Sequence, residues 1–189
     1  MRARDGSGHG GDGEESHIPP KIDGEGGLCV REARPDDHDV VGALTVEAFR
    51  DVAGTRLGDD YAAELADVAG RALGSVVLVA ERDGVVAGSV AYVRDASSPL
   101  AEMLRPGEAG IRMLAVAPGA QRGGVGAALL AACVERARAD GRVGIALFST
   151  DVMVAAHRLY LRAGFRRARE RDWEPSAGLG LLSFVKELR

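Results

Sequence analysis

Residues 116–130 read VAPGAQRGGVGAALL, which places four glycines and a proline directly before an alanine- and leucine-rich run. From Val125 the apolar residues recur at the i, i+3, i+4, i+7 spacing of an amphipathic helix, and Gly141 closes that pattern. Ahead of Pro118, the apolar segment 110–116 is typical of a strand. The glycines therefore form a turn that leads from a strand into a helix.

This glycine turn has the properties of an anion-binding site. The first turn of a helix presents backbone N–H groups that lack an internal acceptor, and the helix dipole adds positive potential there. Gly123, Gly124 and Gly126 carry no side chain that would keep a phosphate from these amides. No Lys-Ser/Thr pair follows the glycines, and no third glycine completes a GxGxxG pattern, so two familiar phosphate loops do not fit. A surface turn with chance glycines stays open as the alternative.

Around this turn the sequence predicts a single α/β (α+β) domain at 28–189, with a mixed, mostly antiparallel central sheet flanked by helices. Residues 1–27 hold eight glycines and almost no large apolar side chain, so we predict a disordered tail there. The expected elements are a strand at 28–34, a helix around 40–48, a helix at 59–73, a hairpin at 75–95 turning at Asp83-Gly84, a loop at 95–109, strands at 110–116 and 143–149, helices at 125–140 and 152–163, a loop at 172–180, and a last strand at 181–188.

The composition of the chain excludes some classes of protein and suggests some kinds of ligand. No apolar run approaches the roughly 18 to 20 residues of a membrane span, and no secretory signal opens the chain. Cys29 and Cys133 lie far apart, so we expect neither a disulfide framework nor a metal site, and a cytoplasmic location. Residues 28–111 carry a net charge of −7 and residues 112–189 one of +6. This division suits an anionic ligand and a cationic partner, unless the arginines merely solvate exposed faces.

Two sequence blocks resemble the GNAT family of N-acetyltransferases. The family's acetyl-CoA signature is Arg or Gln, two residues, Gly, one residue, and Gly or Ala, which Gln121, Gly124 and Gly126 match in register. A second block, MVAAHRLYLRAGF (153–165), is similar to a family helix that carries Leu-Tyr and then Gly-Phe. Met153 stands where the family has asparagine. The resemblance spans about residues 28–189 and implies the acyl-CoA N-acyltransferase fold.

The resemblance implies a binding site for acetyl-CoA. In the family, the strand before the glycine turn splays from its neighbour and offers its backbone to the pantetheine arm, while the turn amides bind the pyrophosphate, here with the added charge of Arg122. Carried onto this sequence, the cofactor-binding residues are Leu114, Ala115, Val116, Gln121, Arg122, Gly123, Gly124, Val125, Gly126 and Ala127.

Two residues are candidates for catalysis. The resemblance implies that Tyr160 is the general acid that protonates the leaving thiolate, although it also lies on the apolar stripe of its helix and fits a core aromatic. For the general base, Glu108 shares the alternation of Gly110, Arg112 and Leu114 if the strand begins that early. The alternative for Glu108 is a solvated loop carboxylate after Pro106-Gly107.

We therefore expect an N-acetyltransferase that passes an acetyl group from acetyl-CoA to a primary amine of a small molecule or peptide by direct attack. A cationic acceptor and a homodimer are compatible with this expectation, and neither nucleic acid nor membrane is an expected partner. The alternative from another class is a degenerate family member that binds acyl-CoA as a sensor without turnover. A Rossmann-like nucleotide domain is disfavoured by the missing glycine and by the hairpin before the turn.

Overall fold

One twisted sheet organises the chain. The computed structural model describes residues 22–23, 27–53, 57–175 and 178–188. In these residues eight strands are ordered β1-β2-β3-β4-β5-β6-β8-β7, and every neighbouring pair is antiparallel except β5 and β6. The strands are β1 (Ile22–Asp23), β2 (Leu28–Glu32), β3 (Val76–Arg82), β4 (Val85–Val93), β5 (Glu108–Val116), β6 (Gly144–Thr150), β7 (Arg166–Arg167) and β8 (Leu181–Glu187). The predicted mixed, mostly antiparallel sheet is confirmed.

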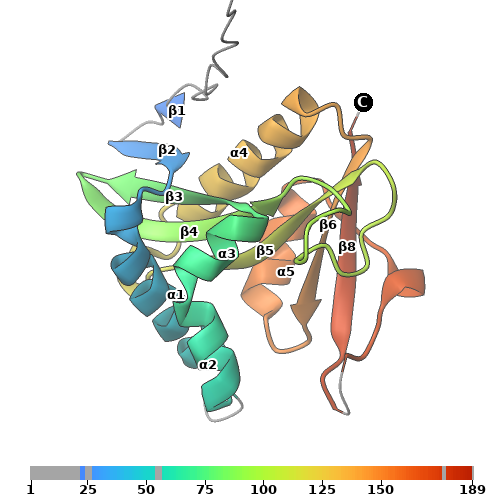
Figure 1. Ribbon diagram of the computed structural model, residues 1–189, viewed down its shortest axis with the longest axis horizontal. Helices are drawn as coiled ribbons and strands as arrows, with labels where there is room; N and C mark the ends of the chain where they lie inside the picture. The colour runs from blue at the N-terminus through green and yellow to red at the C-terminus, as the bar shows by residue number, and fades with distance from the viewer. Residues whose placement is uncertain (1–21, 24–26, 54–56, 176–177, 189) are drawn as a thin grey trace, which may run out of the picture.

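Helices cover both faces of this sheet. They are α1 (His38–Ala53), α2 (Asp59–Ala66), α3 (Val68–Gly74), α4 (Val125–Ala139) and α5 (Val154–Arg162). The first three lie on one face, with α4 and α5 on the other (Figure 1). Leu129 and Leu130 of α4 are fully buried in the main core, which also contains Tyr160 of α5. On the opposite face Val41 of α1 packs against Val79 of β3. The sheet is thus the middle of three layers.

The predicted hairpin is present. Strands β3 and β4 pair from Val76 to Arg82 and reverse at Asp83 and Gly84. Both turn residues have positive φ, at 52° and 78°. Two consecutive positive φ values are what a type I′ turn requires, and Asp-Gly supplies them at low cost.

The helix predicted at 59–73 is divided in two. Helix α2 ends at Ala66, because Asp67 leaves the helical region with φ −77° and ψ 77°. The Asp67 side chain then accepts a hydrogen bond of 2.8 Å from the Gly70 amide and caps α3. Aspartate favours this N-cap role, so local capping overrides the continuous apolar spacing on which the single helix was predicted.

Other differences concern very short strands and one boundary. Strand β7, which the sequence does not predict, pairs with β8 at the sheet edge, and β5 begins at Glu108 rather than at residue 110. Strand β1 pairs with Val30 and Cys29 although the sequence placed residues 22–23 in the tail. The remainder of that predicted tail lies outside the described residues, apart from Gly27. Among the described helices, none has the length and apolar character needed to cross a membrane.

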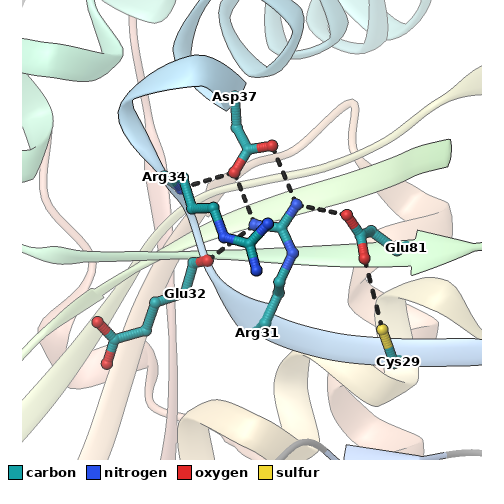
Figure 2. Close-up of polar contacts among 6 residues, drawn as sticks. All are labelled: Cys29, Arg31, Glu32, Arg34, Asp37 and Glu81. Atoms are coloured by element: carbon teal, nitrogen blue, oxygen red, sulfur yellow. Dashed lines mark hydrogen bonds and ion pairs between the residues drawn. The ribbon is translucent and has the colours of Figure 1, made fainter. Parts of the chain in front are cut away.

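A charged cluster fixes the start of α1 against the sheet. Arg31 of β2 donates to both carboxylate oxygens of Asp37, at 2.6 and 3.0 Å, and to Glu81 of β3 (Figure 2). Asp37 also accepts from the Arg34 backbone N–H at 2.6 Å. The hydrogen bonds from Arg31 are the main cause that lowers the pKa of Asp37 to about 2, so this carboxylate stays charged at neutral pH. The cluster thereby holds α1, whose far end reaches the cavity described next.

Candidate active site

The sheet opens where β5 and β6 part. The two strands pair in parallel only from Glu108 to Ile111 and from Gly144 to Leu147. Strand β5 continues to Val116 and β6 to Thr150, with no further pairing between them in the described structure. Beyond Ile111, the edge of β5 that faces β6 therefore keeps free peptide groups. This is the splay that the resemblance implies.

A β-bulge changes the face of the sheet on which the side chains at the open end of β5 lie. The pairing of β4 with β5 skips one residue at Met113, which has a φ of 51°. Before the bulge Ala109 and Ile111 face α4, and after it Leu114 and Val116 do so. Alternation along the strand therefore changes phase at Met113, as a bulge causes. Without the bulge, the side chains of Leu114 and Val116 would face α1.

A cavity of about 970 Å³ lies at this opening. Its lining comes from α1, β5, the glycine turn, α4, α5 and β8, so it reaches both faces of the sheet. Its volume matches the upper range for small-molecule sites. Nine of the ten predicted cofactor-binding residues line it, which are Leu114, Ala115, Val116, Gln121, Arg122, Gly124, Val125, Gly126 and Ala127. Gly123 does not.

The glycine turn has the conformation of an anion cradle. Arg122 and Gly124 both have positive φ, at 64° and 84°, and Gly124 is the N-cap of α4. The Ala128 amide is bonded to the Gly124 carbonyl, so the amides before it in the first turn have no acceptor inside the helix. A Cβ built on Gly124 would meet nothing within 4 Å. The turn thus offers free donors beside open space, which fits a pyrophosphate.

Gly126 has a different role. A Cβ at this position would lie 3.0 Å from Leu159 Cδ2 and 3.5 Å from Val116 Cγ2. That contact is tighter than ordinary packing, so glycine lets α4 approach α5 and β5 closely.

Charged residues are distributed unevenly around the cavity. Four cationic side chains line it, namely Arg122, Arg138, Arg162 and Lys186, against two carboxylates, Asp51 and Glu135. Asp51 belongs to α1, whereas Glu135 lies on α4. The cationic excess favours an anionic ligand along α4 and α5. The sequence reasoning did not single out Asp51, Arg138 or Lys186 because each is far in sequence from the two family blocks or outside their motifs.

Tyr160 is buried and is not one of the residues that line the cavity. Its side chain is 5% exposed, and its ring packs against Phe165 and Phe184 with centroids 6.3 and 5.4 Å away. Burial raises the pKa of Tyr160 to about 12, an effect partly offset by the neighbouring Ser149 hydroxyl. Ser149 lies on the splayed end of β6, and its buried Oγ has no hydrogen-bond partner among the described residues. The phenol therefore stays protonated at neutral pH, close to the strand opening.

The structure does not bring Glu108 to the cavity. Both of its carboxylate oxygens accept 2.8 Å hydrogen bonds from Arg171, and Oε2 also accepts from the Arg105 amide. The bulge at Met113 further ends the alternation that would have placed Glu108 on the face of Leu114. The prediction of Glu108 as general base is therefore wrong in its geometry, because the carboxylate is occupied in an ion pair away from the site.

We expect Glu108→Gln to lower stability rather than turnover. The Arg171 and Glu108 side chains are 5% and 14% exposed, so loss of the carboxylate leaves a buried guanidinium without its counter-charge. Breaking such a pair costs about 3 kcal/mol. Denaturant unfolding and kcat per folded molecule would measure the two effects. Glu170→Gln, in an exposed pair 3.8 Å from Arg166, is the control and should change stability by less than about 1 kcal/mol. A large loss of kcat at normal stability would restore Glu108 as the base.

The chain is also similar to known proteins. The family model described as acetyltransferase (GNAT) family matches residues 44–165, which include the bulge, the glycine turn and α5. No curated protein matches the chain in sequence.

Within the described residues, no group of three or more His, Cys, Asp or Glu side chains is arranged to hold a metal ion.

Solved structures share the architecture over most of the chain. A putative acetyltransferase of the GNAT family from Desulfovibrio desulfuricans is 23% identical, with 85% of this chain and 98% of that chain covered and a TM-score of 0.65. A ribosomal-protein-alanine N-acetyltransferase from Brucella melitensis is 25% identical, with 84% and 99% covered and a TM-score of 0.62. A putative acetyltransferase from Salmonella typhimurium, solved with its cofactor acetyl-CoA, is 22% identical, with 86% and 94% covered and a TM-score of 0.63.

Proposed function

Because the chain belongs to the acetyltransferase (GNAT) family, we propose that it transfers an acetyl group from acetyl-CoA to a primary amine of a small molecule or peptide. The observation that carries this proposal is the cavity at the open ends of β5 and β6, which is lined by the glycine turn and its amides without an acceptor inside the helix. The similar Salmonella protein, solved with acetyl-CoA, supports the same ligand.

The residues of the cavity fit the parts of acetyl-CoA. Amides of the glycine turn and of the first turn of α4 bind the pyrophosphate, while Arg122 adds positive charge. The free backbone edge of β5 at Leu114–Val116 holds the pantetheine arm. Gly126 lets α4 and α5 close around the ligand. Acetyl-CoA supplies an acyl group already activated as a thioester.

The acceptor amine enters from the α1 side. Phe49 and Asp51 line the cavity there, on the face of the sheet opposite α4 and α5. A carboxylate at this entrance attracts a cationic amine, which agrees with the net charge of −7 over residues 28–111. The neutral amine forms the new N–C bond as the C–S bond breaks, and Tyr160 gives its proton to the departing sulfur. A cationic amine gives one proton to water before the attack and a second after the N–C bond has formed, and the Tyr160 phenolate takes a proton back from water.

A binding module without turnover is the second candidate. Met153 in place of the family's asparagine, and the burial of Tyr160, favour it. Residue 110, which is often acidic in members of the family that this sequence resembles, is glycine and so supplies no carboxylate. In this alternative the protein binds CoA but does not transfer an acetyl group.

One experiment separates the two candidates. The protein is titrated with CoA by calorimetry and then mixed with acetyl-CoA, a thiol reagent and a panel of amines that includes di- and polyamines. We expect CoA binding together with thiol release above the hydrolytic background for at least one amine. Binding without release for every amine would favour the sensor, and absence of binding would overturn both. The homodimer and the cytoplasmic location stay predictions.

A further inference from the structure

Arg82 contacts the glycine turn from a distant part of the chain. It is the last residue of β3, and its Nη2 donates a hydrogen bond to the backbone carbonyl of Gly123, 41 residues further on. The guanidinium lies so close beneath the turn that a Cβ on Gly123 would overlap it. Gly123 does not have a positive φ, so a side chain at this position would conflict with the guanidinium of Arg82 rather than with the backbone conformation.

This hydrogen bond fixes the direction of one amide. The described peptide bonds are all trans, so the carbonyl of Gly123 and the N–H of Gly124 point in opposite directions across their shared peptide plane. Arg82 holds the carbonyl on the side away from the cavity, which Gly123 does not line. Gly124 does line it. The Gly124 N–H, on the opposite side of that peptide plane, therefore belongs to a residue at the cavity wall.

Arg82 also supplies charge and holds a strained turn. Among the side chains that the structure describes, no carboxylate lies within 4.0 Å of its guanidinium, so none of these carboxylates pairs with its positive charge. Arg122, directly before Gly123, has a φ of 64°, which costs free energy in a residue with a side chain. A contact that pins the neighbouring peptide keeps such a conformation populated.

We propose that Arg82 is a positioning residue for the phosphate site. It orients the peptide between Gly123 and Gly124 so that the Gly124 amide faces the cavity, and it adds a positive charge behind the turn. The inference rests on the proposed function, because the anion it serves is the pyrophosphate of a CoA ester. It concerns a residue outside both family blocks.

The first test compares ligands with and without phosphate. Arg82→Ala should weaken CoA binding by about tenfold or more, the range for a hydrogen bond with a charged partner, while pantetheine binding changes less than about twofold. Arg82→Lys keeps the charge but loses the planar guanidinium, so its CoA affinity should lie between those of the wild type and Arg82→Ala. Arg94→Ala is the control, since Arg94 is 57% exposed and pairs with Asp140. Calorimetric Kd values and melting curves report the results. Wild-type CoA affinity in folded Arg82→Ala would overturn the inference, as would equal loss for CoA and pantetheine.

A double-mutant cycle with Gly123→Ala tests the contact itself. In the wild type the added methyl group displaces the guanidinium, and CoA affinity should fall about as far as in Arg82→Ala. In the Arg82→Ala background the same substitution should have almost no further effect, because nothing remains to displace. Additive losses would overturn the inference. Failure of the wild type itself to bind CoA would instead overturn the proposed function, so the two failures are distinguishable.

Discussion

Replacement of Gly124 by aspartate should abolish CoA binding while the domain still folds. Gly124 caps α4 with a φ of 84°, and a side chain there would extend into open space beside the unpaired amides of the turn. Aspartate tolerates positive φ better than most residues, so the fold survives. Its carboxylate, however, would occupy the phosphate position. Two like charges 4 Å apart repel by about 4 kcal/mol at a surface, or roughly a thousandfold in Kd.

Gly124→Asn is the matched control. Asparagine has the same size and an equal tolerance of positive φ, but it carries no charge. We expect it to weaken CoA binding far less than Gly124→Asp, with similar melting temperatures for the two variants. If both variants bound CoA like the wild type, the glycine turn would not be the phosphate site. If both lost binding equally, bulk rather than charge would be the cause.

The parts of the site that lie within one sequence block were predictable. The apolar run 110–116, the glycines at 123–126 and the apolar spacing from Val125 predict a strand, a turn and a helix start, and all three features depend on interactions between near neighbours in the chain. The same holds for the Asp83-Gly84 hairpin, whose turn chemistry is contained in two residues. The cofactor-binding residues that the family resemblance implies lie in the block around the glycine turn, and nine of the ten line one cavity.

The features of the site that could not be predicted from the sequence mostly depend on partners far away in the chain. Glu108 meets Arg171 across 63 residues, and no local pattern indicates that pairing. Arg82 meets Gly123 across 41 residues, where the sequence shows only a charged residue at the end of a strand. The bulge at Met113 is local in position, but alternation of apolar residues does not reveal it. A period-2 pattern assumes an unbroken strand, and one extra residue reverses every side chain that follows.

Tyr160→Phe tests the chemistry directly. If the phenol protonates the leaving thiolate, removal of its oxygen should lower turnover by about 10²- to 10⁴-fold, the range for general acid catalysis. CoA affinity should hardly change, because the ring still packs against Phe165 and Phe184. The pKa of Tyr160 is about 12, so the phenol of the wild type stays protonated at neutral and moderately alkaline pH. We therefore expect no loss of turnover from deprotonation of Tyr160 in that pH range. Steady-state kinetics and calorimetry measure both effects.

Tyr92→Phe provides the control for removal of a buried tyrosine hydroxyl. Tyr92 is fully buried on β4, and its hydroxyl donates to Asp140 at 2.8 Å rather than lying beside the strand opening. This variant should lose about 1 kcal/mol of stability without loss of turnover. Tyr160→Phe with wild-type turnover would show that Tyr160 is a core aromatic, provided that chemistry limits the rate. A pre-steady-state burst of thiol would reveal slow product release, and single-turnover rates would then decide between acid and core residue.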